Sequence, residues 1–347
     1  MKEKRLLIAL ASILILFIAG AFGLGSMPST GSNAKTAFTI DKYNVSDREF
    51  EAFLQNNKAL TTSYFKRTYN ADYGKSFWTS TFNGENPLAY AKQKALDELT
   101  KVKVEQIIMM ENGIVSDISY EAFLQSYEQE NKDRAKKIAN NQPIYGPQKY
   151  GIAEYYSYYQ SMNVQKLIDK WTKEAKSTMS GDELKAYYDK VKQRYFHKGY
   201  AFDYEKISIH TEAGKQEQLT KIRQASIEKN IPVDEAAASL GVAVTTEQLT
   251  LDLEETSKED TLSQNLYTRF LDFSTGEYSE IEQSDSEAYM YRLVAKRDKG
   301  LEKYEDVKSS VIQLYVKEML ETEVVKRLKE TKVQLNKEVF HKITIKT

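Results

Sequence analysis

The chain has 347 residues, 41% of them hydrophobic, with 49 basic and 50 acidic side chains and a formal net charge of −1. A charge balance this even argues against nucleic acid as a partner, because nucleic-acid-binding domains concentrate positive charge. Cysteine is absent, which excludes disulfides, thiol catalysis, thiolate metal sites and a lipid-bearing cysteine.

One long apolar stretch, Leu6–Gly25, follows the basic residues Lys2, Lys4 and Arg5. About 20 apolar residues are enough for a helix to cross a membrane, and the positive-inside rule then places the N-terminus in the cytoplasm. A cleavable signal peptide has the same layout. We therefore expect residues 1–25 to be a single-pass membrane anchor or a signal peptide. The bulk of the protein would be extracytoplasmic, or secreted if the signal is cleaved.

The folded part is expected to begin near Phe38, after a small, polar segment at 26–37 that has the composition of a flexible linker. A short extended stretch follows. Ser46 and Glu49 then have the spacing of a capping box, in which each side chain bonds the other residue's backbone N–H. This pattern predicts a helix from Asp47.

A longer helix is predicted from Pro87 to the Asn112–Gly113 pair, with Asn86 as its N-cap. Its apolar residues recur at helical spacing and are read as core. The segment from Val45 is echoed by the segment from Val115. Two helices with similar starts and a duplicated helical unit are both consistent with this echo.

The pattern changes after a second capping box at Ser180–Glu183, which opens a helix through Tyr195. Strand-forming and helix-forming segments then alternate, as in a compact α+β domain of roughly 100 residues. The predicted strands are Tyr200–Ile209, Val242–Leu251 and Ala288–Lys296, and the predicted helices are Gln216–Lys229, Asp234–Leu240 and Thr261–Asp272.

The chain returns to a helix at Tyr304–Lys332 and is predicted to end in a strand at Val339–Ile345. The expected fold class is therefore α+β. A mainly helical body would be assembled from both ends of the chain, with an α+β domain inserted between them. The expected domains are 38–198 and 299–347 for the helical body and 199–298 for the insert.

Several short segments, in this order, resemble a known family: Val45–Gln55, Tyr187–Tyr188, Asp234–Gly241, Gly276–Ser279 and Tyr304–Lys308. Their order and spacing are similar to those of the extracytoplasmic parvulin-type peptidyl-prolyl isomerases and foldases, the SurA-like and PrsA-like chaperones. The resemblance runs from about Phe38 to the C-terminus. It implies a helical chaperone body like the SurA N-domain and a parvulin-like domain that binds prolyl peptides with two histidines on adjacent strands.

The chain departs from that family at the expected catalytic positions. In Glu205–Ile209, Lys206 or its neighbour stands where the first histidine is expected, and Met290 stands where the second is expected. The family's glycine-rich loop is replaced by the acidic Leu249–Thr261 segment. His210 would reach the site only in a shifted register. Lys206, His210 and Met290 are therefore degenerate parvulin positions, and we assign no catalytic residue.

Tyrosines are concentrated between the predicted helical segments of the body. A tyrosine offers a large amphipathic surface at little cost in side-chain entropy, so these rings are candidates for contact with unfolded clients. Packing within the helical body is the alternative. The candidate client-binding residues are Tyr145, Tyr150, Tyr155, Tyr156, Tyr158, Tyr159 and Trp78.

The sequence thus predicts a membrane-anchored foldase or chaperone that binds non-native exported polypeptides and has little isomerase activity. The alternatives are an active prolyl isomerase and a dedicated, non-catalytic adaptor for one exported partner. The three histidines, His197, His210 and His341, lack ligand-like spacing, so we predict no metal site. No cofactor is expected either, because nucleotide-binding motifs are missing from the sequence.

Overall fold

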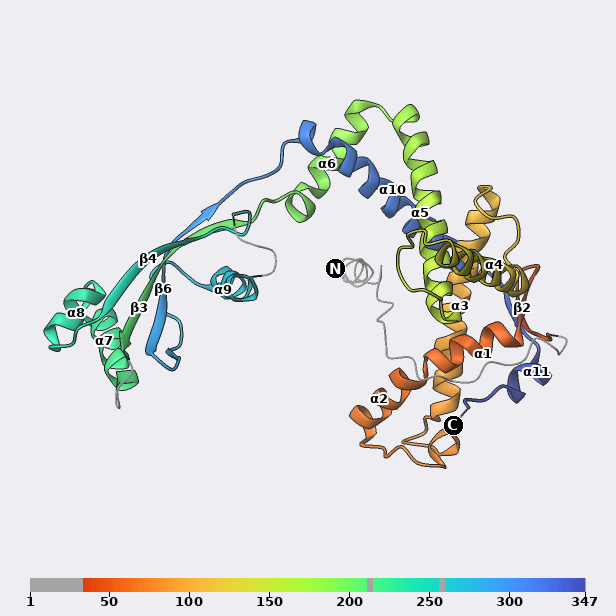
Figure 1. The fold of residues 1–347 in the computed structure, drawn as a ribbon, viewed down its shortest axis with the longest axis horizontal. Helices are drawn as coiled ribbons and strands as arrows, with labels where there is room; N and C mark the ends of the chain where they lie inside the picture. The colour runs from red at the N-terminus through yellow and green to blue at the C-terminus, as the bar shows by residue number, and fades with distance from the viewer. Residues whose placement is uncertain (1–33, 211–214, 256–259, 347) are drawn as a thin grey trace. The chain divides into compact units, whose positions relative to one another are not determined.

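The computed structural model describes residues 34–210, 215–255 and 260–346. The apolar stretch at Leu6–Gly25 lies outside these ranges. Within them, no helix combines the length and the apolar character needed to cross a membrane. The described residues form an α+β fold that is mostly helical and contains two antiparallel sheets (Figure 1). They divide into two compact units, the first reaching to Met179 and resuming at Ile312, and the second spanning Ser180–Val311.

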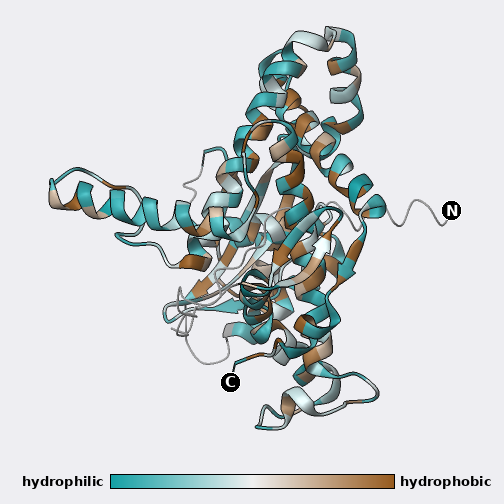
Figure 2. Ribbon diagram, turned by 90° about the vertical axis from the view of Figure 1, so that its right-hand side faces the viewer, coloured by the Kyte–Doolittle hydropathy of each residue, from teal (hydrophilic) through white to brown (hydrophobic). Residues whose placement is uncertain are grey.

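The first unit is mainly helical and is built from both ends of the described chain. In chain order its elements are β1 (Thr36–Ile40), β2 (Tyr43–Ser46), α1 (Asp47–Asn56), α2 (Lys58–Tyr69), the 3-10 turn η2 (Phe77–Thr79), α3 (Pro87–Glu111), α4 (Tyr120–Ala139), α5 (Ile152–Thr178), the later part of α10 (Tyr304–Glu330), β7 (Val333–Leu335) and α11 (Lys337–Lys342). Hydrophobic and hydrophilic residues, brown and teal in Figure 2, alternate along the helices, as expected for helices that bury one side.

Side chains cap the helices of this unit largely as predicted. The Ser46 hydroxyl accepts a hydrogen bond from the Glu49 N–H at 3.2 Å, and the Asn86 side chain accepts one from the Ala89 N–H at 2.9 Å. The carboxylate of Glu49, however, bonds Lys103 instead of the cap backbone. The helix that follows the echoed segment begins later than the echo predicts. Its N-cap is Ser119, whereas the serine that the echo aligns with Ser46 lies three residues earlier.

The three-stranded sheet has the order β2-β1-β7 and joins the two ends of the described chain. The prediction of a strand at Val339–Ile345 is wrong. The terminal strand is β7, which pairs antiparallel with β1, and a short helix follows it. Asn336 caps that helix, and the helix turns Phe340 into the core, where it stacks on Phe50 at 4.8 Å between ring centroids. Burial of the Phe340 ring against Phe50 therefore favours a helix over a strand in this segment.

The second unit contains a four-stranded antiparallel sheet of order β4-β3-β6-β5. Its elements are α6 (Gly181–Tyr195), β3 (Tyr200–His210), α7 (Lys215–Lys229), α8 (Val233–Ser239), β4 (Thr245–Leu251), α9 (Thr261–Asp272), β5 (Glu282–Gln283), β6 (Glu287–Asp298) and the start of α10. The predicted capping box of α6 is present in both directions.

Helices cover both faces of this sheet (Figure 1). On one face α7 and α8 pack on Ile207, Ile209 and Met290. On the other, α9 packs on Phe202 and Leu293. Because successive side chains of a strand point to opposite faces, neighbouring residues of β3 and β6 lie in different environments.

Candidate functional site

The positions that the sequence equates with catalytic histidines lie on opposite faces of the second unit's sheet. Met290 is 0% exposed and pairs in register with Ile207, on the face covered by α7 and α8. Lys206 pairs in register with Tyr291, on the face covered by α9. The two positions therefore do not form one site. Of the neighbours of Lys206, Ile207 faces Met290, and both of these side chains are apolar. The other neighbour, Glu205, pairs with Arg292 at 3.2 Å.

Lys206 is engaged in an ion pair instead of standing free over the sheet. Its ammonium bonds Glu287 and lies 5.0 Å from the centroid of the Tyr289 ring. The hydrogen bond with Glu287 raises the pKa of Lys206 and lowers that of Glu287. A lysine whose pKa is raised stays protonated near neutral pH, so it is a poor general base. His210 pairs in register with Glu287 at the exposed end of β3.

Tyrosine rings lie on the α9 face of the sheet beside Lys206. Burial raises the pKa of Tyr291 to about 12, and the neighbouring Tyr289 adds to this effect. Burial also raises the pKa of Tyr204, whose ring lies 5.7 Å from that of Tyr291. These hydroxyls remain protonated at neutral pH. The face therefore offers aromatic surface and neutral hydroxyls instead of proton-transfer groups.

The tyrosine-rich segment of the first unit contributes mainly to packing between α4 and α5. Tyr120, Phe123, Tyr150 and Tyr155 form a buried aromatic cluster. Of the predicted client-binding residues, Tyr145 is 90% exposed and Tyr158 is 43% exposed. The remaining predicted residues are buried or half-buried: Tyr150, Tyr155, Tyr156, Tyr159 and Trp78. Their role in client binding stays a prediction, with Tyr145 and Tyr158 the most accessible of the set.

Arg134 holds the loop that presents Tyr145. Its guanidinium donates from Nη1 to the carbonyl oxygens of Tyr145 at 3.0 Å and of Pro147 at 2.6 Å. It also stacks 4.3 Å from the centroid of the Tyr150 ring, and its Nε bonds Glu130 at 2.8 Å. One buried cation thus fixes the backbone of the loop while the Tyr145 ring points to solvent.

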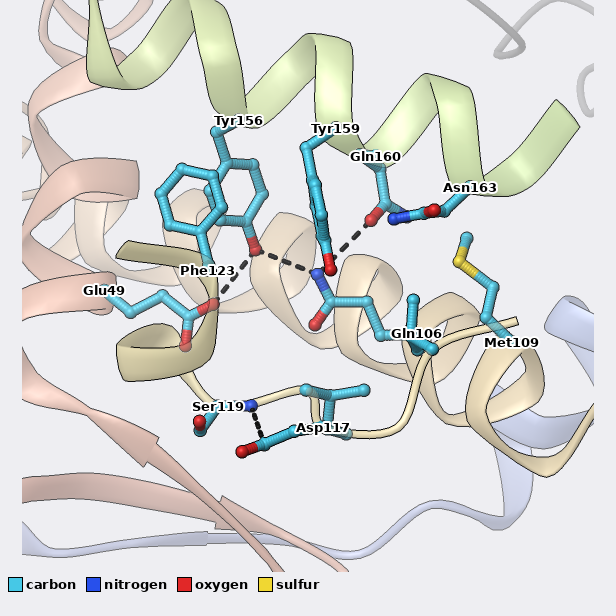
Figure 3. A pocket seen from close by; sticks show the side chains of 12 residues that line it. Glu49, Gln106, Met109, Asp117, Ser119, Phe123, Tyr156, Tyr159, Gln160 and Asn163 are labelled. Atoms are coloured by element: carbon cyan, nitrogen blue, oxygen red, sulfur yellow. Dashed lines mark hydrogen bonds between the residues drawn. The ribbon is translucent and has the colours of Figure 1, made fainter. Parts of the chain in front are cut away.

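A buried polar network joins α1, α3 and α5 inside the first unit (Figure 3). The Tyr156 hydroxyl donates to Glu49 Oε1 at 3.0 Å, and Gln106 Nε2 donates to the Tyr156 oxygen at 3.2 Å and to Gln160 Oε1 at 3.3 Å. Lys103 Nζ lies 2.8 Å from Glu49 Oε1. Burial, reinforced by the Glu49 charge, raises the pKa of Tyr156 well above its usual range. This hydroxyl therefore stays neutral, donating to Glu49 and accepting from Gln106.

The cavity beside this network has a volume of about 10 Å³ and is lined by Glu49, Gln106 and Tyr159 among others. A space of this size holds about one water molecule, whereas small-molecule sites are usually at least about 300 Å³. We therefore assign this network to the stability of the helical unit and not to binding of a small ligand.

The sequence analysis missed this network, although a signal is present in the pattern. Lys103 and Gln106 follow Leu99 by four and seven residues, so they continue the apolar stripe of α3. A charged residue on a core-facing stripe predicts a buried partner. The partner, Glu49, was assigned to a cap because its spacing from Ser46 fits that role equally well.

The chain is similar in sequence to one protein described as a chaperone. No protein-family model matches the chain. Over 148 residues the chain is 26% identical to a protein described as a chaperone for lacto-N-biosidase from Bifidobacterium longum subsp. longum. The match covers 42% of this chain and 51% of that protein. The chain thus spans about half the length of the curated relative it matches.

Solved structures of SurA-like chaperones and PrsA foldases are similar to the chain. One solved structure comes from the pair of SurA-like chaperones PEB4 and Cj1289 of Campylobacter jejuni and shares 15% sequence identity with this chain. The match covers 86% of this chain and 98% of that chain, with a TM-score of 0.28. PrsA from Lactococcus lactis shares 14% identity over 89% and 99% of the two chains, with a TM-score of 0.23. The resemblance expected from the sequence is confirmed.

Proposed function

We propose that this protein is an extracytoplasmic chaperone that binds non-native exported polypeptides and has little or no prolyl isomerase activity. The observation that carries the proposal is the 148-residue similarity to a protein described as a chaperone. The exposed ring of Tyr145 on a loop fixed by Arg134 supports it, because a rigid aromatic anchor binds with little loss of entropy.

The low isomerase activity follows from the sheet of the second unit. Rotation about a peptide bond crosses a barrier of about 18–20 kcal/mol, and a catalyst lowers it only with groups that bind the twisted amide more tightly than the planar one. Met290 and Ile207 provide apolar packing on one face, and Lys206 is held by Glu287 on the other. Neither face offers the paired histidines that the resemblance implies.

The architecture fits a chaperone body with a degenerate parvulin-like insert. In this proposal the helical unit provides the body, the β3–β6 sheet with α7, α8 and α9 is the insert, and residues 26–37 link the body to the N-terminal segment. The apolar stretch Leu6–Gly25 would hold the protein at the outer face of the cell membrane, an assignment that the sequence alone supports.

A dedicated client is a second candidate, favoured by the relative's name, which specifies one enzyme, lacto-N-biosidase. A chaperone for a single client would bind one exported protein tightly, whereas a general one would bind many weakly through adaptable surfaces. The two candidates differ in client range and share the same fold.

The test combines two measurements on the purified full chain. Cis/trans exchange of a short prolyl peptide reports isomerase activity, and light scattering of an unrelated, chemically unfolded protein reports suppression of aggregation. We expect suppression without catalysis. Catalysis that is lost in Lys206→Ala or His210→Ala would show that the protein is an isomerase and overturn the proposal.

The client range is tested with a panel of unfolded exported proteins. Suppression across the panel indicates a general chaperone, and suppression of one member indicates a dedicated one. Tyr145→Ala should weaken suppression, whereas Tyr195→Ala, which removes another exposed ring in the second unit, serves as the matched control. If the protein suppresses the aggregation of none of the panel members, both candidates are contradicted.

A further inference from the structure

The two edges of the four-stranded sheet in the second unit differ in kind. One edge is β5, only two residues long. The other is β4, whose seven residues pair with β3 along their whole length. Within the described residues, no strand pairs with the outer side of β4. One edge of the sheet is therefore a two-residue strand, and the other edge is a full-length strand.

An open edge strand carries backbone N–H and C=O groups that are free to pair with another extended chain. Proteins usually protect such edges with charged side chains, especially lysine, or with proline, a bulge or a very short strand. Thr245–Leu251 contains neither lysine nor proline and a single charged residue, Glu247, and its register with β3 runs without a shift. The edge therefore has the features of a strand that accepts an additional strand.

The side chains of β4 define the chemistry of a partner. Leu249 lies opposite Tyr204 and Glu247 lies opposite Lys206, so both side chains are on the α9 face, two positions apart. Leu249 is 38% exposed, and Glu247 is exposed. Lys206 forms its ion pair with Glu287 and not with Glu247. One exposed apolar side chain and one negative charge thus lie next to each other on this face of the edge.

We propose that the outer edge of β4 binds an extended segment of the client polypeptide as an added strand. The segment carries an apolar residue beside Leu249 and a basic residue beside Glu247. This inference rests on the proposed chaperone function, because a non-native client exposes extended backbone. A second copy of the chain is a poorer partner: β4 contains no basic residue, so no β4–β4 register supplies a cation to Glu247.

The probe is a fluorescent peptide with the repeat Val-Thr-Lys-Thr, which places valine and lysine two positions apart on the same face of a strand. It is titrated into the full chain and followed by anisotropy. A peptide with the same side chains and alternate N-methylated amides is its matched control, since it keeps the side chains and blocks pairing through the backbone. N-methylation should weaken binding about tenfold or more, the loss of more than one hydrogen bond. Amide exchange in Thr245–Leu251 should slow when the unmodified peptide binds, a readout that needs no variant.

Charge reversal tests the side-chain preference. Glu247→Lys should weaken binding of the valine–lysine peptide about two- to fivefold and strengthen binding of a valine–glutamate peptide, as expected for an exposed ion pair. Glu235→Lys is the control, because Glu235 is exposed on α8 in the same unit and leaves the edge unchanged. Equal effects of both variants would overturn the assignment to β4.

The outcomes separate this inference from the proposed function. Suppression of aggregation without peptide binding, or equal binding of the N-methylated peptide, overturns edge pairing and leaves the chaperone function intact. Peptide binding at β4 without suppression supports edge pairing and contradicts the chaperone function. If the protein has the mass of a dimer in solution and Glu247→Lys makes it a monomer, the edge pairs with a second copy of the chain. That result would overturn the client proposal.

Discussion

Lys103 Nζ lies 2.8 Å from Glu49 Oε1, and each side chain is only 2% exposed. The pair connects α3 to the first turn of α1, and Lys103 also donates to the Ile118 carbonyl oxygen at 2.6 Å. Removing two charges from water costs several kcal/mol for each ion, a cost that the pair offsets only while both partners are present. The helical unit therefore depends on the two residues jointly.

Lys103→Met should destabilise the first unit by about 3–5 kcal/mol, because it leaves the Glu49 carboxylate buried without its cation. Adding Glu49→Gln should recover part of this loss, since no uncompensated charge then remains. Denaturant unfolding followed by tryptophan fluorescence measures both variants. The only two tryptophans, Trp78 and Trp171, lie in this unit. A double variant no more stable than the single one would contradict this account.

Arg134→Met should release the loop that carries Tyr145 and destabilise the first unit by about 1.5–3 kcal/mol, the range for hydrogen bonds to a charged group. Limited proteolysis should then cut within residues 140–150 faster than in the unmodified protein. Lys136→Met, at an exposed position of the same helix, is the control and should leave cleavage unchanged. Unaltered cleavage in Arg134→Met would show that the guanidinium does not hold the loop.

Gly199→Ala should destabilise the second unit by about 1–3 kcal/mol. Gly199 has φ +82°, and a Cβ there would lie 2.5 Å from the Tyr267 hydroxyl oxygen. Adding Tyr267→Phe removes the clash but also the acceptor of the Tyr200 N–H, so Tyr267→Phe alone is measured as well, and the double variant should lose less than the sum of the two single losses. Hydrogen exchange of β3 amides reports the effect. Gly241→Ala in the same unit is the control, because Gly241 also has a positive φ, +67°, and a Cβ there has no atom within 4 Å. An equal loss in this variant would refute the steric explanation.

The Lys206–Glu287 ion pair should make stability depend on pH. The pKa of Glu287 is lowered by its hydrogen bond with Lys206, so its contribution is present above the ordinary glutamate pKa of about 4.3. The contribution is lost as the pH falls through the lower, folded-state pKa. Glu287→Gln should cost at most about 1 kcal/mol at pH 7, since the pair is partly exposed. The difference from the unmodified protein should shrink below about pH 4, and a difference that is constant with pH would contradict this account.

Met290→His tests whether the parvulin-like position is merely missing its histidine. The imidazole would enter the apolar core beside Ile207, on the face opposite Lys206. We expect a loss of about 1–3 kcal/mol for burying a polar group without a partner and no gain in prolyl isomerisation. Ala295→His on the same strand, at a position that is only half-buried, should be tolerated better. A gain of isomerase activity in Met290→His would restore the enzymatic alternative.

Local rules in the sequence predicted much of the secondary structure. The capping residues Ser46, Asn86 and Ser180 define helix starts that the structure reproduces, because a cap needs only neighbouring backbone N–H groups. The helix at Thr261–Asp272 has the predicted bounds. These features depend on contacts a few residues apart, and such contacts are visible in sequence spacing.

The prediction for the C-terminal segment failed because its alternating pattern was outweighed by a distant contact, the stacking of Phe340 on Phe50. The candidate site also depends on contacts between residues that are far apart in the sequence. The resemblance predicts that Lys206 and Met290 stand at the positions of the expected histidines, whereas the register of β3 with β6 places them on opposite faces of the sheet. Likewise, Lys103 and Glu49 are 54 residues apart in the sequence and meet only when α1 packs on α3. Spacing encodes short-range hydrogen bonds, whereas the choice of partner across the core depends on which surfaces the whole chain buries together.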